Sequence, residues 1–168
     1  VADAVDGLAR ACREVGAVLV GGETAQMPDT YLPGGIDVAG CMIGTVDDAR
    51  LLDGSRVRDG DLVLGLGADG LHTNGFSLAR RVLAESGLRL DDVLPGGSIL
   101  VGDALLARHR PYGRALLPLI DVGKIRALAH VTGGGLAGNL IRVLPDGLGA
   151  RITGDAWPRP ALFRWLVS

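Results

Sequence analysis

Two segments of the chain share one design, in which an apolar run leads into glycine-rich polar residues and then into a helical pattern. They are "GLGADGLHTNG" (residues 65–75) and "LAHVTGGGLAGN" (residues 128–139). A short apolar run bounded by glycines is typical of a buried strand. Each segment therefore predicts a strand–loop–helix junction, and such junctions are typical of an α/β fold. We expect an α/β protein of mixed α+β character.

Glycine is abundant in this sequence but is not periodic. It supplies 27 of the 168 residues, about twice its average share of roughly 7%. The glycines stand between apolar runs, which excludes a collagen-like or disordered chain. They are expected at tight turns and at sites lined by backbone.

Charge and cysteine content exclude several classes of protein. The net charge is −2 with no basic run, which argues against a nucleic-acid partner. No apolar stretch approaches the ~20 residues of a membrane span, so no membrane partner is expected. Cys12 and Cys41 lie far apart, without metal-type spacing. Two such cysteines are typical of a protein in the reducing cytoplasm, and we expect both thiols to be buried.

Hydrophobic periodicity predicts the following order of elements. A helix at 1–15 ends at Gly16, and a second helix begins near residue 76. The segment 101–120 holds two helices broken near Pro111. Another helix ends at Pro145, and a last helix begins in 160–168. Five strands are expected at 17–22, 36–48, 62–67, 125–132 and 149–153. Asn74 or Thr73 is placed to cap the helix after the first junction. Met27 and Trp165 are expected to be packing residues.

A polar, turn-rich segment at 53–61 is the best candidate for a domain boundary. It divides the chain into residues 1–52 and 53–168. Both glycine-rich junctions lie in the second part. No internal repeat and no segment of low complexity is present.

The two junctions are suited to an anion. A helix N-terminus offers backbone N–H groups without helical partners and the positive end of the helix dipole. Glycines let the backbone approach the anion closely. Phosphate is the simplest such ligand, although neither junction has the Walker pattern or a dinucleotide-binding context. Ordinary tight turns remain the alternative.

Three titratable residues stand at or near predicted strand ends. His72 and His130 each lie in one junction, where an imidazole could orient, protonate or stabilise a phosphate. The alternative is a structural histidine at each place. Glu23, in "GGETAQMPDTY" (residues 21–31), is either a metal-bridging or substrate-binding acid or a solvated carboxylate in a turn. His109 has only basic neighbours in sequence and is expected at the surface.

With these features together, the chain resembles the phosphoribosylformylglycinamidine cyclo-ligase family, the aminoimidazole ribonucleotide (AIR) synthetases of purine biosynthesis. The matching motifs are "GGETAQMP" (21–28), "DVAGCMIGTVD" (37–47), "DGLHTNGFSLAR" (69–80), "AHVTGGGLAGNLIRVLP" (129–145) and "WPRPALFRWL" (157–166). Their order and spacing match throughout, so the resemblance covers essentially the whole chain. The first motif together with the later H-x-T-G-G-G is specific to this enzyme within its superfamily.

The resemblance implies a ligase that closes the imidazole ring of formylglycinamidine ribonucleotide at the expense of ATP, releasing ADP and phosphate. It implies that ATP and Mg²⁺ bind, with their main ligands in a preceding glycine-rich, lysine- and aspartate-containing segment that this sequence lacks. The metal ligands themselves are not identified. A cytoplasmic homodimer is also implied.

The family's functional residues fall on specific positions of this chain. The residues expected in catalysis are His72, His130 and Glu23. The residues expected to bind substrate or phosphate are Thr24, Thr73, Asn74, Gly75, Thr132, Gly133, Gly134 and Gly135.

The resemblance also implies that residues 1–52 end an N-terminal ATP-binding domain and that residues 53–168 form most of a C-terminal α/β/α layered domain. We therefore expect a central fragment that is inactive alone. Two alternatives stay open. One is a phosphate- or nucleotide-binding module without turnover. The other is a different ATP-dependent enzyme of the superfamily, such as a selenophosphate synthetase or a thiamine monophosphate kinase, against which the two motifs argue.

Overall fold

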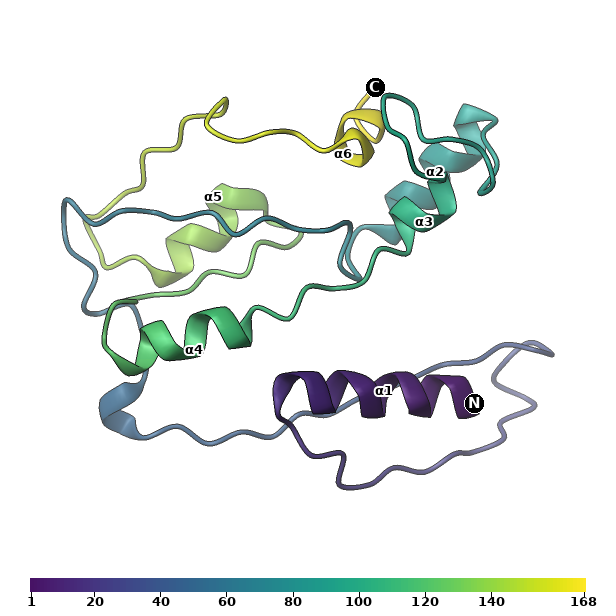
Figure 1. Cartoon of the computed structure of the whole chain (residues 1–168), viewed down its shortest axis with the longest axis horizontal. Helices are drawn as coiled ribbons and strands as arrows, with labels where there is room; N and C mark the ends of the chain where they lie inside the picture. The colour runs from purple at the N-terminus through teal and green to yellow at the C-terminus, as the bar shows by residue number, and fades with distance from the viewer. The chain divides into compact units, whose positions relative to one another are not determined.

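The structure is a computed structural model that describes residues 1–168, and it divides into two compact units, Val1–Leu51 and Leu52–Ser168. The first unit contains α1 (Ala2–Val15) and a short 3₁₀ helix, η1 (Asp48–Arg50). The second unit contains α2 (Phe76–Ser86), α3 (Val101–Leu105), α4 (Gly113–Asp121), α5 (Gly135–Leu140), the 3₁₀ helix η2 (Ile141–Val143) and α6 (Ala161–Trp165). Figure 1 shows these helices joined by long extended segments.

The predicted first helix and its glycine stop are confirmed. Gly16 follows α1 in the left-handed conformation with φ 77°, which glycine adopts without a Cβ penalty. The Ala17 N–H donates to the Cys12 carbonyl over 2.9 Å. This contact satisfies one of the carbonyl groups left over at a helix C-terminus.

The predicted helices of the second unit are confirmed as well. Two helices, α3 and α4, lie on either side of Pro111, and α5 with η2 ends shortly before Pro145. The helix predicted after Pro160 is α6. These elements depend on local patterns, because helix hydrogen bonds join residues four apart.

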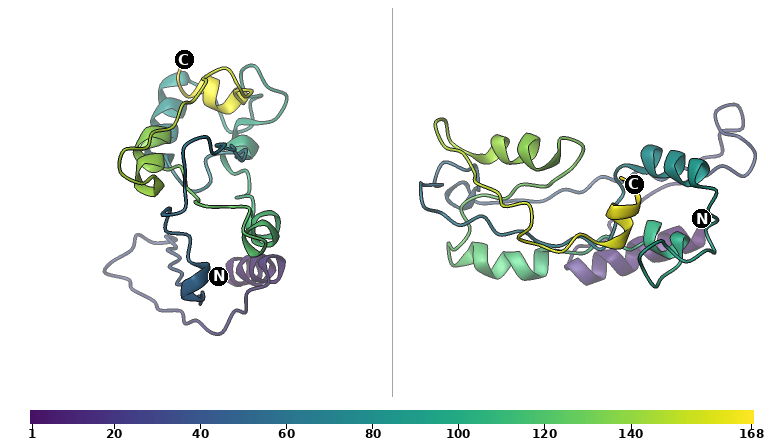
Figure 2. Two further views of the ribbon diagram at one scale, coloured as in Figure 1. Left: turned by 90° about the vertical axis from the view of Figure 1, so that its left-hand side faces the viewer. Right: turned by 90° about the horizontal axis from the view of Figure 1, so that it is seen from above.

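The five predicted strands are not formed. Segments 17–22, 36–48, 62–67, 125–132 and 149–153 contain no strand, and the one β-type pairing is an isolated antiparallel bridge between Val93 and Leu100. Figures 1 and 2 show extended tubes without strand arrows in these places. The residue types favour an extended backbone, but a strand also needs a neighbouring backbone with which to pair.

The segments predicted as strands also leave their side chains exposed. The exposed fraction is 93% for Val20, 90% for Ile43 and 88% for Leu62. No residue of the first unit is buried. The prediction of two buried thiols is therefore wrong, since Cys41 is exposed and Cys12 only half-buried. The predicted packing role of Met27 is also wrong, because that side chain is 47% exposed.

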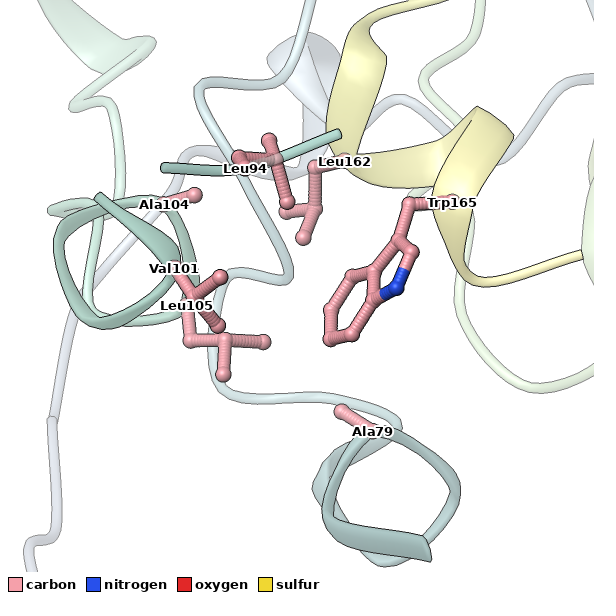
Figure 3. Close-up of a cluster of buried hydrophobic side chains, with 7 residues drawn as sticks. All are labelled: Ala79, Leu94, Val101, Ala104, Leu105, Leu162 and Trp165. Atoms are coloured by element: carbon pink, nitrogen blue, oxygen red, sulfur yellow. The ribbon is translucent and has the colours of Figure 1, made fainter. Parts of the chain in front are cut away.

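The hydrophobic core lies in the second unit, between α2, α3 and α6 (Figure 3). Its buried members are Ala79, Leu94, Val101, Ala104, Leu105, Leu162 and Trp165. Figure 3 shows the Trp165 indole extending from α6 into the space between Leu105 of α3 and Ala79 of α2. The predicted packing role of Trp165 is confirmed.

The core supports the first glycine-rich junction from behind. Leu71 packs against the buried cluster, and Gly70 is itself buried. A Cβ at Gly70 would lie 3.1 Å from the Ala104 carbonyl oxygen of α3. The loop that carries His72 is thus fixed by packing.

None of the helices is long and apolar enough to span a bilayer.

The two tryptophans offer a matched test of this core. Trp165→Ala removes a side chain that is 7% exposed, and we expect it to lower the free energy of unfolding by about 3–5 kcal/mol. Trp157 is 46% exposed, so Trp157→Ala should change it by no more than about 0.5 kcal/mol. Urea denaturation followed by circular dichroism measures both. Equal losses in the two variants would contradict the core described here.

Candidate functional site

The loop between the apolar segment at 62–67 and α2 has an unusual backbone. His72 and Thr73 have positive φ angles of 51° and 72°, and they are the only non-glycine residues of the chain that do. Gly75 follows with φ 75°. Positive φ is a rare state for a β-branched residue such as threonine, and such strain costs on the order of 1–3 kcal/mol per residue. The strain is therefore concentrated on one residue predicted to act in catalysis and one predicted to bind substrate or phosphate.

His72 is a buried polar residue, 8% exposed. Its Nε2 accepts a hydrogen bond from the Asp69 backbone N–H over 3.0 Å. An imidazole nitrogen that accepts carries no proton, so this contact favours the neutral form with hydrogen on Nδ1. Burial lowers the pKa of His72, and the neighbouring His109 lowers it further. The hydrogen bond and the lowered pKa thus both favour the neutral imidazole, in which Nδ1–H is the donor.

The predicted cap of α2 is wrong. Gly75 occupies the N-cap position, and no side chain caps the helix. The Thr73 hydroxyl donates instead to the His72 carbonyl oxygen, and the Asn74 side-chain amide donates to the same oxygen over 3.3 Å. Both side chains thus stabilise the strained turn rather than the helix. The first N–H groups of α2 receive no side-chain partner at the N-cap.

Two residues distant in sequence fix the start of the same loop. The Arg110 guanidinium makes a two-pronged ion pair with Asp69, in which Nε lies 3.0 Å from Oδ2 and the terminal nitrogen contacts Oδ1. Arg110 lowers the pKa of the Asp69 carboxyl chiefly through this hydrogen bonding. The Tyr112 hydroxyl donates to the Gly67 carbonyl over 2.8 Å. Sequence reasoning missed both residues, because nothing local connects them to a loop more than 40 positions away.

All three histidines of the chain lie in one cluster. The rings of His72 and His109 are stacked, with centroids 4.2 Å apart and planes at 18°. The His109 and His130 centroids are 6.1 Å apart, and the Tyr112 ring lies 6.1 Å from that of His72. His109 is exposed, as predicted, yet it joins the two glycine-rich junctions in space. Its place in the cluster has no signal in the sequence.

The second junction is organised by a buried amide. Asn139 is 4% exposed, and its side-chain nitrogen donates to the Gly135 carbonyl over 2.8 Å. The Thr132 hydroxyl donates to the Asn139 side-chain oxygen over 3.3 Å. Gly135 has φ 63° and begins α5. The segment from Gly133 to Gly135 presents exposed backbone. The sequence did not single out Asn139 as a site residue, although it lies within the second glycine-rich junction (residues 128–139).

Glu23 and Thr24 lie in the first unit, with exposed side chains. Their expected position opposite the histidines stays a prediction. No three or more His, Cys, Asp or Glu side chains of the chain form a group that could hold a metal ion, so no residue is assigned to a metal.

The second unit brings the rings of His72, His109 and His130 into one cluster, and so links the two glycine-rich junctions. Thr73, Asn74 and Gly75 follow His72 in the chain, and the glycines at 133–135 follow His130. The residue types at both junctions are ones that can bind an anion. Backbone N–H groups without side-chain caps, exposed glycine backbone and a neutral imidazole donor can all face an oxyanion. Because the imidazole is held by packing and a hydrogen bond, it needs little reorganisation when charge develops nearby.

Comparison with known proteins adds a family to this geometry. The sequence model for "AIR synthase related protein, C-terminal domain" matches residues 58–168, and that for the N-terminal domain of the same name matches residues 1–46. The chain is 48% identical to the chloroplastic phosphoribosylformylglycinamidine cyclo-ligase of Arabidopsis thaliana, over 96% of this chain and 42% of that protein. It is 49% identical to the cyclo-ligase of Sorangium cellulosum, over 96% and 47% respectively.

A larger protein shows the same similarity. The trifunctional purine biosynthetic protein adenosine-3 of Bos taurus is 44% identical, over 96% of this chain and 16% of that protein. The chain thus spans less than half the length of the relatives it matches.

Two glycines of the first junction test how closely the loop must approach the core. A Cβ at Gly70 would lie 2.9 Å from the Ala107 Cβ, whereas a Cβ at Gly67 would meet nothing within 4 Å. We expect Gly70→Ala to lower the free energy of unfolding by about 1–3 kcal/mol through overpacking. Gly67→Ala should cause no loss. Chemical denaturation measures the free energy of unfolding of both variants. Similar losses in the two would show that Gly70 does not approach the core closely.

Proposed function

Because the chain belongs to the AIR synthase related family, we propose that it is part of a phosphoribosylformylglycinamidine cyclo-ligase acting in purine biosynthesis. In the proposed reaction, ATP phosphorylates the formamide oxygen of formylglycinamidine ribonucleotide. An internal nitrogen then attacks the activated carbon, phosphate leaves, and the imidazole ring closes to give aminoimidazole ribonucleotide and ADP. Identities of 44–49% over 96% of the chain support this assignment.

One observation in the structure carries the proposal. Both glycine-rich junctions meet at the histidine cluster, where His72 stacks on His109 and His109 neighbours His130. Phosphoryl transfer depends on positioning and on stabilising the charge of the transferred group. Two neighbouring glycine-rich junctions with a fixed imidazole would suit both tasks.

We assign the following roles within the second unit. The backbone at Thr73, Asn74 and Gly75, with the uncapped start of α2, binds the transferred phosphoryl group. The Nδ1–H of His72 donates to an oxygen on which negative charge develops. Thr132 and the glycines at 133–135 line the other side, with His130 beside them.

The roles of the first unit rest on the family. We propose that Glu23 and Thr24 face the site from the preceding domain and that ATP binds chiefly to residues of the longer protein. Mg²⁺ is proposed for the longer protein only. The proposed domains are residues 1–52 and 53–168, which the compact units Val1–Leu51 and Leu52–Ser168 and the two family matches support.

The proposed architecture of the longer protein is a homodimer whose C-terminal domain has α/β/α layers. Exposed apolar side chains support this arrangement: Val63, Leu64 and Leu66 in segment 62–67 are 55%, 83% and 53% exposed. A sheet would pair the backbone of such segments and cover their side chains. We propose a cytoplasmic location, although the Arabidopsis relative is named as chloroplastic.

The activity is tested by ADP release that depends on formylglycinamidine ribonucleotide. We expect turnover by the protein expressed from the full reading frame and none by the 168-residue chain alone. Circular dichroism confirms that both are folded. If both are folded and neither releases ADP, the cyclo-ligase proposal fails, and a binding module without turnover takes its place.

Two substitutions at His72 separate its chemistry from its structural role. In His72→Gln, the side-chain oxygen can still accept from the Asp69 N–H, so folding should be retained while kcat falls by about 100- to 1,000-fold. In His72→Ala, that N–H loses its partner, which costs about 1–3 kcal/mol in addition. Steady-state kinetics and chemical denaturation measure the two effects. Full activity in His72→Gln would remove His72 from the catalytic site.

A further inference from the structure

We propose that Arg110 and Tyr112 are positioning residues that hold the loop around His72 so that its imidazole stays in one hydrogen-bonded form. The effect of these two residues on turnover rests on the proposed function. Their effect on the imidazole is independent of that function. Neither residue was expected from the sequence to take part in the site.

The first anchor is the ion pair between Arg110 and Asp69. The side chains are 50% and 38% exposed, and an exposed ion pair contributes little to overall stability. A two-pronged pair, however, fixes the orientation of the carboxylate and thus of the residue that carries it. The backbone N–H of that same residue, Asp69, donates to Nε2 of His72 over 3.0 Å. The guanidinium therefore acts on the imidazole through one intervening residue.

The second anchor lies two positions earlier in the loop. The Tyr112 hydroxyl donates to the Gly67 carbonyl over 2.8 Å. Pro111 stands between the two anchoring residues, and its ring limits the backbone freedom of the segment that presents them. Gly67 and Asp69 are thus both tied to one short segment. Gly67 has no side chain that could pack against a neighbour, so the Tyr112 hydroxyl is what restrains this position.

The charged and titratable groups around His72 come from three segments. Asp69 lies in its own loop, His109 and Arg110 lie in the anchoring segment, and His130 lies in the second junction. His109 stacks on His72 at 4.2 Å between centroids, so a proton on one ring disfavours a proton on the other. The anchoring segment therefore supplies both the restraint on the loop and the ring packed against the imidazole.

The restraint has a direct chemical consequence. While the Asp69 N–H points at Nε2, the proton of the neutral imidazole is on Nδ1. Without the ion pair, residue 69 can turn away, and the imidazole then exchanges between its two neutral tautomers. Only one of these has the donor on the nitrogen that the proposed reaction uses.

The test compares Arg110→Gln with Arg126→Gln in the protein expressed from the full reading frame. Arg126 forms an ion pair with Asp61, and these side chains are 41% and 31% exposed. The control thus removes a pair of the same kind at another place in the second unit. Nitrogen NMR of isotope-labelled histidine reports which nitrogen of His72 carries the proton. Tyr112→Phe, which removes one hydroxyl, tests the second anchor even if Arg110→Gln does not fold.

We expect one dominant tautomer in the unmodified protein and in Arg126→Gln, and a mixture in Arg110→Gln and Tyr112→Phe. We also expect kcat to fall by about 10- to 100-fold in Arg110→Gln, because the imidazole is misplaced, with little change in KM. Unchanged His72 nitrogen signals in both site variants would overturn the proposal, as would an equal change in Arg126→Gln. If the unmodified protein shows no turnover, the proposed function fails, while the nitrogen signals still decide the positioning role.

Discussion

The site described here depends on the hydrogen bond from the Asp69 backbone N–H to Nε2 of His72. A buried imidazole without this partner would have an unsatisfied acceptor, and the turn with two successive positive φ angles would lose one of the contacts that hold it. The bond is supported on each side. Arg110 and Tyr112 fix the loop from the solvent side, and the cluster around Trp165 packs behind it.

Packing and chemistry are therefore coupled in the second unit. Gly70 is buried against α3, and the next two residues are Leu71, which contacts the core, and His72, which faces the histidine cluster. The glycine packed against the core and the imidazole are thus only two positions apart in the chain. This arrangement is consistent with the general need of catalytic groups for a fixed support.

The parts of the fold that the sequence predicted are those that local interactions determine. The α1 helix with its Gly16 stop, the helices beside Pro111 and the packing of Trp165 follow from periodicity and from the backbone properties of glycine and proline. Strand formation could not be settled in this way, because a ladder requires a partner strand that periodicity does not identify. Of the site, the junction histidines were visible as candidates. Arg110 and Tyr112 were not, because their contacts with the loop join positions 41 and 45 residues apart.

We propose that the two glycine-rich junctions form one anion site around the histidine cluster. Amide NMR of the protein from the full reading frame, titrated with inorganic phosphate, shows whether they do. The amide signals of residues 73–77 and 133–136 should then shift together, with the same midpoint concentration. Shifts confined to one junction, or two separate midpoints, would contradict it.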